Sequence, residues 1–398
     1  ADCEEKFGLV STHLLGGKDG KTTQRAASDM MDLITVNKGK VPVRSPNTAD
    51  DLQAIKFTGG SSGIPKGVMQ TYRVFNSCIT SMLAAFGFES NDRHLLAAPM
   101  THGANTMILP IFAVGGTQLL MGQPSPAAIL DAIDRMRATT IFVPPTVCYM
   151  MLEEDRINDV NLMSLRHFII GGATIRPDVV GRAMPIFNHA METCFGQTEV
   201  PQIAICMRAK DWQDPKNYAS TGRATCMTKI GIMDKAGNLL PPGHDGEIVL
   251  AGDLVMKGYY KMPDQTAKTI IDGWLHTGDV GLIDNRGFVF VKDRIRDVVI
   301  TGGFNVYPND VEAVLGQHPD VSECVVFGLP DDKWGECVHA AVELSKTADS
   351  DEAALIAFVK SRLDSVKAPK RIHISDHLPR SPVGKVLRRE AKIKYANS

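Results

Sequence analysis

The chain has 398 residues, of which 44% are hydrophobic and 22% charged, the usual balance of a globular protein with two or three domains. Its formal net charge of −2 offers no general attraction to nucleic acid or to anionic membranes, so neither partner is expected. The longest apolar stretch, residues 107–114, contains Pro110 and is too short to span a bilayer.

The first informative segment in chain order is residues 57–67, Phe-Thr-Gly-Gly-Ser-Ser-Gly-Ile-Pro-Lys-Gly. Its glycines let backbone N–H groups approach an anion, while three hydroxyls and a lysine add further donors and a positive charge. The composition indicates a loop that binds nucleotide phosphates, although a solvated turn can have the same composition. The residues expected to contact phosphate are Thr58, Gly60, Ser61, Ser62, Gly63 and Lys66.

Up to about residue 200, apolar strands alternate with amphipathic helices. The helical pattern of residues 129–136, for example, precedes the strand-like run 139–143. This alternation predicts βα units and a largely parallel sheet that is covered on both faces. A second strand, 167–170, leads into the small residues 171–173, and ligands of such sheets gather at the carboxyl ends of the strands.

The pattern changes in the second half of the chain. From about residue 218 to 292, short strands and tight turns predict an antiparallel β subdomain. After about residue 296, helical and strand patterns predict a compact α+β domain. The eight cysteines form no CxxC pair and lie largely in apolar surroundings, and residues 1–6 are acidic and polar. These features predict reduced core thiols in a cytoplasmic protein without a signal peptide.

Five further motifs follow the glycine loop in a fixed order. They are Cys-Phe-Gly-Gln-Thr-Glu at 194–199, Thr-Gly-Asp at 277–279, Asp-Arg-Ile-Arg-Asp at 293–297, Gly-Gly-Phe-Asn-Val-Tyr-Pro at 302–308 and Pro-Arg-Ser-Pro-Val-Gly-Lys at 379–385. Together with the loop, they resemble the adenylate-forming superfamily of acyl-CoA synthetases, firefly luciferases and peptide-synthetase adenylation domains. The resemblance covers about residues 50–390 and is specific for the superfamily but not for the substrate.

The resemblance implies a two-step reaction that uses ATP, Mg²⁺ and CoA. A carboxylate attacks the α-phosphate to give acyl-AMP and pyrophosphate, and a thiol then displaces AMP. The implied fold is an α/β large N-terminal domain (1–295), with parallel sheets and the antiparallel β subdomain, and a small mobile α+β C-terminal domain (297–398) with a hinge near Arg296. Family members place a long α/β region ahead of the glycine loop, so the first part of the large domain is expected to be absent from this chain.

The resemblance also assigns the residues of the adenylation step. Lys385 would bridge the carboxylate and the α-phosphate and neutralise their charge. Thr198 would hydrogen-bond the α-phosphate and Glu199 would bind Mg²⁺, whereas the motif alone is also compatible with both residues capping a helix that begins near Val200. His102 would lie at the mouth of the acyl pocket, where a role in gating or in contacting the carboxylate and a purely structural role stay open.

The remaining assignments concern the nucleotide and CoA. Asp279 would accept hydrogen bonds from both ribose hydroxyls, and Arg294 would reach ribose or phosphate. Gly302 and Gly303 would meet the pantetheine channel. Trp334 would pack either on pantetheine or between the domains. The residues expected around the adenine are Gly171, Gly172, Ala173, Phe195, Gly196 and Gln197, with Phe195 either stacking on the ring or belonging to the core.

The leading interpretation is an ATP-dependent acid:CoA ligase for a fatty or aromatic carboxylic acid. An amino acid substrate is disfavoured because residues 99–115 contain no Asp or Glu to pair with its ammonium group. An acyl-AMP ligase that loads a carrier protein and a non-catalytic adenylate-binding protein stay open. A homodimer is compatible with the sequence, which does not determine the oligomeric state.

Overall fold

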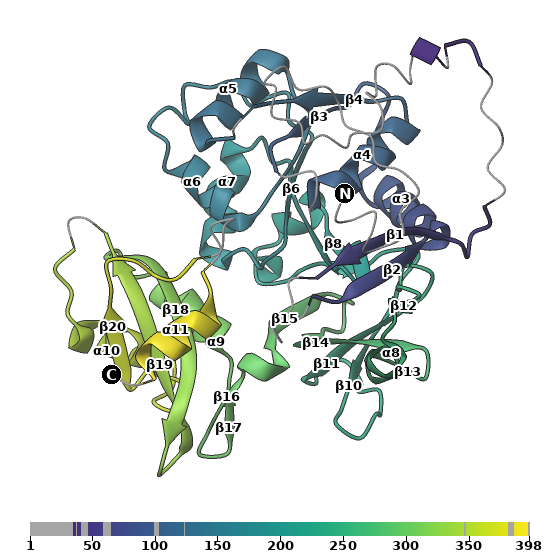
Figure 1. Cartoon of the computed structure of the whole chain (residues 1–398). Helices are drawn as coiled ribbons and strands as arrows, with labels where there is room; N and C mark the ends of the chain where they lie inside the picture. The colour runs from purple at the N-terminus through teal and green to yellow at the C-terminus, as the bar shows by residue number, and fades with distance from the viewer. Residues whose placement is uncertain are drawn as a thin grey trace, which may run out of the picture. The chain divides into compact units, whose positions relative to one another are not determined.

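The structure is a computed structural model that describes residues 35–36, 38–40, 47–58, 65–98, 103–122, 124–345, 348–380 and 386–396 (Figure 1). By its internal contacts the chain divides into two units, residues 1–48 and 49–398. All helices and strands named below belong to the second unit. In the described ranges, no helix is long and apolar enough to cross a membrane.

The largest sheet has seven strands in the order β4-β3-β5-β6-β7-β8-β9. The strands from β4 to β7 run parallel, and β8 and β9 pair antiparallel. The strands are β3 (Arg93–Leu96), β4 (Thr117–Leu120), β5 (Thr140–Val143), β6 (His167–Gly171), β7 (Met191–Gln197), β8 (Val200–Met207) and β9 (Arg223–Ala224). Helix α3 (Tyr72–Phe86) precedes them, and the parallel strands are connected by α4 (Gly103–Ala113), α5 (Pro126–Met136), α6 (Pro145–Leu152) and α7 (Pro177–Ile186).

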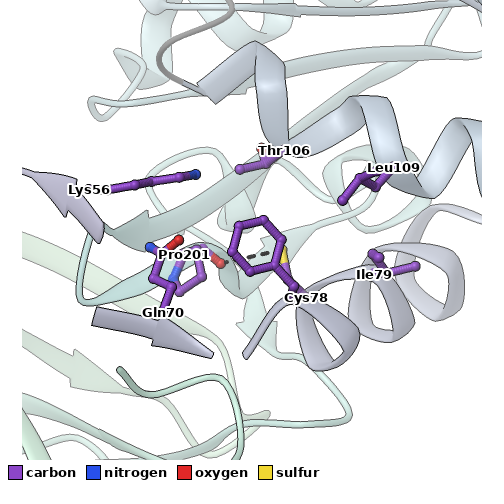
Figure 2. Close-up of a pocket in the computed structure, with 8 residues that line it drawn as sticks. Lys56, Gln70, Cys78, Ile79, Thr106, Leu109 and Pro201 are labelled. Carbon is purple, nitrogen blue, oxygen red and sulfur yellow. Dashed lines mark hydrogen bonds between the residues drawn. The ribbon is translucent and has the colours of Figure 1, made fainter. Parts of the chain in front are cut away.

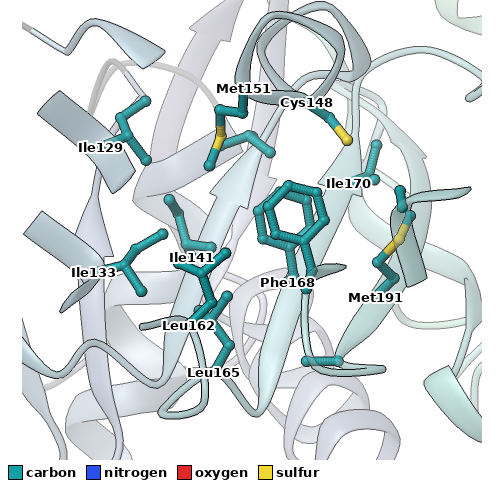
Figure 3. Close-up of a cluster of buried hydrophobic side chains, with 14 of the residues drawn as sticks. Ile129, Ile133, Ile141, Cys148, Met151, Leu162, Leu165, Phe168, Ile170 and Met191 are labelled. Carbon is teal, nitrogen blue, oxygen red and sulfur yellow. The ribbon is translucent and has the colours of Figure 1, made fainter. Parts of the chain in front are cut away.

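Successive residues of the central strands point to opposite faces of this sheet, and both faces are apolar. Ile141 and Phe168 belong to a core cluster with residues of α5, α6 and α7 (Figure 3). Phe142 and Ile169 belong to a second cluster with residues of α3 and α4. Because helices cover both faces, we expect ligands at the carboxyl ends of the strands.

Two antiparallel sheets accompany the large sheet. One has β2 (Gly67–Thr71) between β1 (Leu52–Phe57) and β12 (Gly258–Tyr259). The other has the order β10-β11-β14-β13, with β15 paired to β14. Its strands are β10 (Lys229–Met233), β11 (Gly246–Ala251), β13 (Ile270–Ile271), β14 (Trp274–Ile283) and β15 (Val289–Arg294). The short helices of this half are η1 (Ala209–Gln213), η2 (Pro215–Asn217), α8 (Pro263–Thr269) and η3 (Ile295–Asp297).

The residues after η3 form a separate sheet in the order β17-β16-β19-β18, with β20 paired to β19. One face of the long β18–β19 pair packs against α9 and α10, and the other face packs against α11. The elements are β16 (Val299–Thr301), β17 (Phe304–Val306), α9 (Pro308–Leu315), β18 (Val321–Asp331), β19 (Gly335–Leu344), α10 (Glu352–Lys360), β20 (Arg371–Ile374) and α11 (Arg388–Tyr395).

The structure confirms the expected class, an α/β large region with an antiparallel β part followed by a small α+β region. The domain boundary at Arg296, which lies in η3, stays a prediction. The helix expected near Val200 under the capping alternative is wrong, because β8 begins there and pairs with β7. The expectation of core thiols is wrong for Cys226, which is exposed, whereas Cys78, Cys148, Cys194 and Cys337 are buried.

Candidate active site

A backbone hydrogen bond closes the base of the glycine loop. Thr58 and Lys66 lie at the two ends of the loop, and Thr58 N donates a hydrogen bond to Lys66 O at 3.0 Å. Strand β1 leads into this contact and β2 leads out of it, and the adjoining register pair of the two strands is Phe57 and Gly67. The phosphate contacts expected of the loop stay predictions, as do the roles of His102 and Lys385. The expected site residues that lie outside the described residues are Gly60, Ser61, Ser62, Gly63, His102 and Lys385.

Glu199 lies in the turn between β7 and β8, where Tyr259 holds its carboxylate. The Tyr259 hydroxyl donates a hydrogen bond to Glu199 Oε1 at 2.7 Å. Burial and the neighbouring Glu199 carboxylate raise the pKa of Tyr259, so the phenol is protonated at neutral pH and remains a donor. Lys66 Nζ lies over the face of the same ring, 4.9 Å from its centroid. Sequence reasoning missed Tyr259.

The Glu199 carboxylate is suited to bind a divalent cation. Hard dications prefer carboxylate oxygens, and no salt bridge engages Glu199 within the described ranges. Those ranges contain no group of three or more His, Cys, Asp or Glu side chains that could hold a metal by themselves. Phosphate oxygens of a nucleotide are ligands of the same hard type as this carboxylate.

Thr198 is held by a side chain of strand β2. Gln70 Nε2 donates to Thr198 O at 2.8 Å, while Gln70 Oε1 is buried and has no hydrogen-bond partner among the described residues. Gln70 lines a cavity of about 10 Å³ together with Lys56 and Thr106 (Figure 2). That volume holds about one water molecule and is too small for an organic acid. Burial lowers the pKa of Lys56 at this cavity.

Gln197, Asp279 and Arg294 form one hydrogen-bonded group, although they belong to three different sequence motifs. Arg294 Nε lies 2.7 Å from Asp279 Oδ1, and Gln197 Nε2 donates to Asp279 Oδ2 at 2.7 Å. Burial raises the pKa of Asp279 to about 6, although Arg294 and Gln197 oppose this shift. Each carboxylate oxygen retains a second acceptor position, so the pair of oxygens can still accept from vicinal hydroxyls.

The strand ends expected around the adenine require small residues. A methyl group at Gly171 would lie 2.8 Å from Phe142 Cε2 and 3.0 Å from Cys194 Sγ. At Gly196 it would lie 2.5 Å from the backbone nitrogen of Gln202. Gly172 has a φ of +86°, which favours glycine, and both Gly172 and Ala173 are exposed beyond the end of β6.

Phe195 lies on β7 and packs against the second core cluster, which supports the core alternative for this side chain. It is only partly buried. Stacking of Phe195 on an adenine stays a prediction.

The two segments expected on the CoA side contact each other. Gly302 N donates to Trp334 O at 2.9 Å, and a methyl group at Gly302 would lie 2.8 Å from Trp334 Cε3. Gly302 and Gly303 have φ values of +56° and +82°. The Trp334 side chain is 44% exposed, so much of its surface is open to a ligand. Contacts of these residues with pantetheine stay predictions.

A buried ionic network lies next to the predicted hinge. Arg388 donates to Asp293 at 3.0 Å, to Asp297 at 3.2 Å and to Glu312 at 2.9 Å. The Asp293 side chain is 1% exposed and also accepts from the backbone of Asn309 at 2.9 Å. Burial raises the pKa of Asp293, although Arg388 opposes this shift. The network joins the end of β15 to helices α9 and α11.

Comparison with family models identifies two matched regions. Residues 9–260 match the model described as AMP-binding enzyme, and residues 310–385 match the AMP-binding enzyme C-terminal domain. The first match covers more than half of the chain. It includes Lys66, Glu199 and Tyr259, whereas the segment with Asp279 and Arg294 lies between the two matched regions.

Curated relatives and solved structures agree with these matches. The chain is 35% identical to the medium/long-chain-fatty-acid–CoA ligase FadD8 of Mycobacterium tuberculosis, over 87% of this chain and 62% of that protein. It is 34% identical to a feruloyl-CoA synthase of Amycolatopsis sp., over 89% of this chain and 72% of that protein. The amide bond synthetase McbA from Marinactinospora thermotolerans superposes with a TM-score of 0.87 at 29% identity, covering 99% of this chain and 77% of that structure.

Proposed function

The chain belongs to the AMP-binding enzyme family, and on that basis we propose that it is an ATP-dependent acid:CoA ligase that activates a fatty or aromatic carboxylic acid. AMP-binding acyl-CoA ligases use ATP, Mg²⁺ and CoA, and the two matched relatives named above are CoA ligases. The chain spans 62% of the length of the FadD8 relative, so the activity of that whole protein is carried over only as a proposal.

The observation that carries the proposal is the hydrogen bond between Gln197 and Asp279, 2.7 Å long. It brings a buried carboxylate suited to a ribose next to the segment that contains Thr198 and Glu199. Gln197 holds Asp279, the proposed acceptor for the ribose hydroxyls. The next residues along the chain are Thr198, with a hydroxyl for the α-phosphate, and Glu199, with a carboxylate for a dication. This is the order of groups that a bound nucleotide triphosphate requires from ribose to phosphates.

The residues act by binding, orientation and charge. Asp279 and Arg294 would hold the ribose, Thr198 would donate to the α-phosphate, and Lys66 would contact the phosphates beyond it. A bound Mg²⁺ would neutralise charge on the phosphates, with Glu199 as its protein ligand. Lys385 would place a positive charge between the acid's carboxylate and the α-phosphate, so that two anions can approach each other.

The acid is expected near the carboxyl ends of β5 and β6. Gly103 and Gly171 both lie against the Phe142 ring, and a methyl group at Gly103 would lie 2.5 Å from it. These positions leave no room for larger side chains. Residues 99–115 contain no Asp or Glu to pair with an ammonium group, which favours a fatty or aromatic acid over an amino acid.

Two other acceptors of the acyl group are alternatives to CoA. The solved structure that superposes on 99% of this chain is an amide bond synthetase, so an amine is an alternative acceptor to CoA. A carrier protein is a further alternative thiol acceptor. In each case the first half-reaction is the same.

Product analysis with a panel of acids separates these acceptors. The full chain is incubated with ATP, Mg²⁺ and one acid, together with CoA, a pantetheinylated carrier protein or an amine, and AMP, thioester and amide are measured. The proposal predicts acid-dependent AMP release with acyl-CoA as the product. Product only on the carrier or the amine contradicts CoA as the acceptor, and no acid-dependent AMP with any acceptor contradicts the proposal as a whole.

A further inference from the structure

We propose that Tyr259 is a positioning residue of the candidate active site, which fixes Glu199 for a divalent cation and keeps Lys66 apart from that carboxylate. The inference rests on the proposed function, because it assumes that Glu199 is the protein ligand of the dication. It adds a residue whose hydroxyl and ring face have separate tasks. Both tasks follow from the contacts of Tyr259.

Strand pairing fixes the place of Tyr259. It is the register partner of Val68 on β2, and its backbone N–H donates to Thr266 Oγ1 at 2.9 Å. The following residue, Tyr260, donates from its backbone to Gly67 O at 2.7 Å. Only 4% of the Tyr259 surface is exposed. The ring is therefore held beside the start of β2. That strand begins at Gly67, the residue that follows Lys66.

The hydroxyl of Tyr259 fixes one of the two oxygens of Glu199. Oε1 accepts the phenol hydrogen bond at 2.7 Å, and the Glu199 backbone carbonyl accepts from Met256 N at 2.8 Å. Main chain and side chain are thus restrained together. Oε2 has no hydrogen-bond partner in the described part of the chain, so this oxygen is the one available to a cation. A carboxylate oriented in advance binds a metal at a lower entropic cost than a mobile one.

The ring face of Tyr259 carries Lys66. The ammonium lies 4.9 Å from the ring centroid, and no salt bridge joins Lys66 to Glu199 within the described ranges. An ammonium and a carboxylate that share one neighbour attract each other strongly when they are partly buried. In a direct salt bridge, the Lys66 ammonium would no longer be available to phosphate oxygens. The Glu199 carboxylate would likewise no longer be available to a dication. The aromatic face stabilises the ammonium without neutralising it.

The test measures metal binding itself. Mn²⁺ replaces Mg²⁺ and is titrated by electron paramagnetic resonance into the full chain saturated with a non-hydrolysable ATP analogue. In Tyr259→Phe the ring stays and the hydroxyl is lost, so the Mn²⁺ affinity is expected to fall about tenfold, as for a lost hydrogen bond to a charged group. Affinity for the metal-free nucleotide should stay at the wild-type value, because Lys66 keeps its contact with the ring.

Tyr260→Phe is the matched control. Tyr260 is the next residue along the chain; Lys261 Nζ lies 5.2 Å from its ring centroid, and among the described residues it has no hydrogen bond to Glu199. This variant should bind Mn²⁺ as the wild type does. A wild-type Mn²⁺ affinity in Tyr259→Phe overturns the proposal, and so does an equal loss in Tyr260→Phe.

A second variant breaks the same contact from the other partner. Glu199→Asp keeps a carboxylate but withdraws it from the phenol by one methylene group. Adding Tyr259→Phe to Glu199→Asp should cause no further loss of Mn²⁺ affinity, since the phenol acts only through this carboxylate. Additive losses overturn the proposal. If Tyr259→Phe does not fold, the test uses Glu199→Asp alone, whose Mn²⁺ affinity should fall by a similar factor. A wild-type Mn²⁺ affinity of Glu199→Asp overturns the proposal as well.

Failure of the proposed function is recognised separately in the wild-type chain. Without acid-dependent AMP formation by the wild type, the proposed function fails. If the wild type forms AMP but Tyr259→Phe binds Mn²⁺ normally, only the role of Tyr259 fails.

Discussion

Asp279 and Arg294 lie directly opposite each other as register partners of strands β14 and β15, and Arg294 Nε approaches Asp279 Oδ1 to 2.7 Å. Backbone pairing therefore brings the two side chains to the same place in the sheet. Its carboxylate is buried, and its pKa of about 6 is raised above the ordinary 3.8. Burial accounts for the direction of this shift.

Asp279→Asn should weaken nucleotide binding about 10- to 100-fold, since an amide replaces a charged acceptor of hydrogen bonds. In the wild type, affinity should also fall as the pH drops through about 6, where Asp279 takes up its proton. The variant should lack this pH step. Isothermal titration with ATP between pH 5 and 8 measures both effects, and the exposed Asp332→Asn serves as control. A wild-type pH profile in Asp279→Asn would contradict the assignment.

The same substitution should stabilise the nucleotide-free protein. A carboxyl group whose pKa is raised on folding binds its proton more tightly in the folded state, so its ionisation above pH 6 costs folding free energy. Asp279→Asn removes this cost and should gain about 1 to 3 kcal/mol at pH 8. The gain should nearly vanish at pH 4, close to the ordinary carboxyl pKa of 3.8, because the unfolded chain takes up the proton there as well. Urea unfolding at the two pH values checks the sign, and a loss of stability at pH 8 would refute it.

Arg388→Met should destabilise the fold by about 3 to 5 kcal/mol, because it leaves the Asp293 carboxylate buried without its cation. Asp293→Asn in the same chain should recover part of this loss, since the unpaired charge is then removed. Equilibrium unfolding of the two single variants and of the double variant gives the coupling. Strict additivity would show that the network next to the hinge contributes nothing as a pair.

Gly302→Ala should impair the thiol step selectively. Its φ of +56° disfavours a side chain by about 1 kcal/mol, and the new methyl group would crowd the ring of Trp334. Thioester formation is expected to slow about tenfold or more while acid-dependent AMP formation without CoA persists. Gly237 also has a positive φ, +89°, and a methyl group there would meet no other atom within 4 Å. Gly237→Ala therefore serves as the control for backbone strain alone. Equal loss in both half-reactions would argue against a role on the CoA side.

Much of the fold was predictable because its local patterns are strong. The alternation of strand and helix before residue 200 predicted the parallel sheet, since each central strand is apolar on both faces, as Ile141 and Phe142 illustrate. The secondary structure of the segment after Glu199 was harder to predict, because a polar turn followed by apolar residues fits both a helix cap and a strand hairpin. Pairing with β7 decided it, and that contact is not local in sequence.

The candidate site was predictable only where the resemblance supplied positions. Asp279 and Arg294 were predicted in this way, but the contact of Asp279 with Gln197 spans 82 positions and no local pattern encodes it. Tyr259 was missed because a buried tyrosine in a short strand looks like ordinary core. Its hydroxyl contact with Glu199, 60 positions away, and the Lys66 ammonium over its ring distinguish it from a core residue.

The central claim, that the chain joins a carboxylic acid to AMP, is tested most directly by acid-dependent exchange of labelled pyrophosphate into ATP in the absence of CoA. We expect exchange that requires both Mg²⁺ and a fatty or aromatic acid and that is lost in Lys385→Ala. Absence of exchange in the wild type with every acid of the panel, or undiminished exchange in Lys385→Ala, would contradict it.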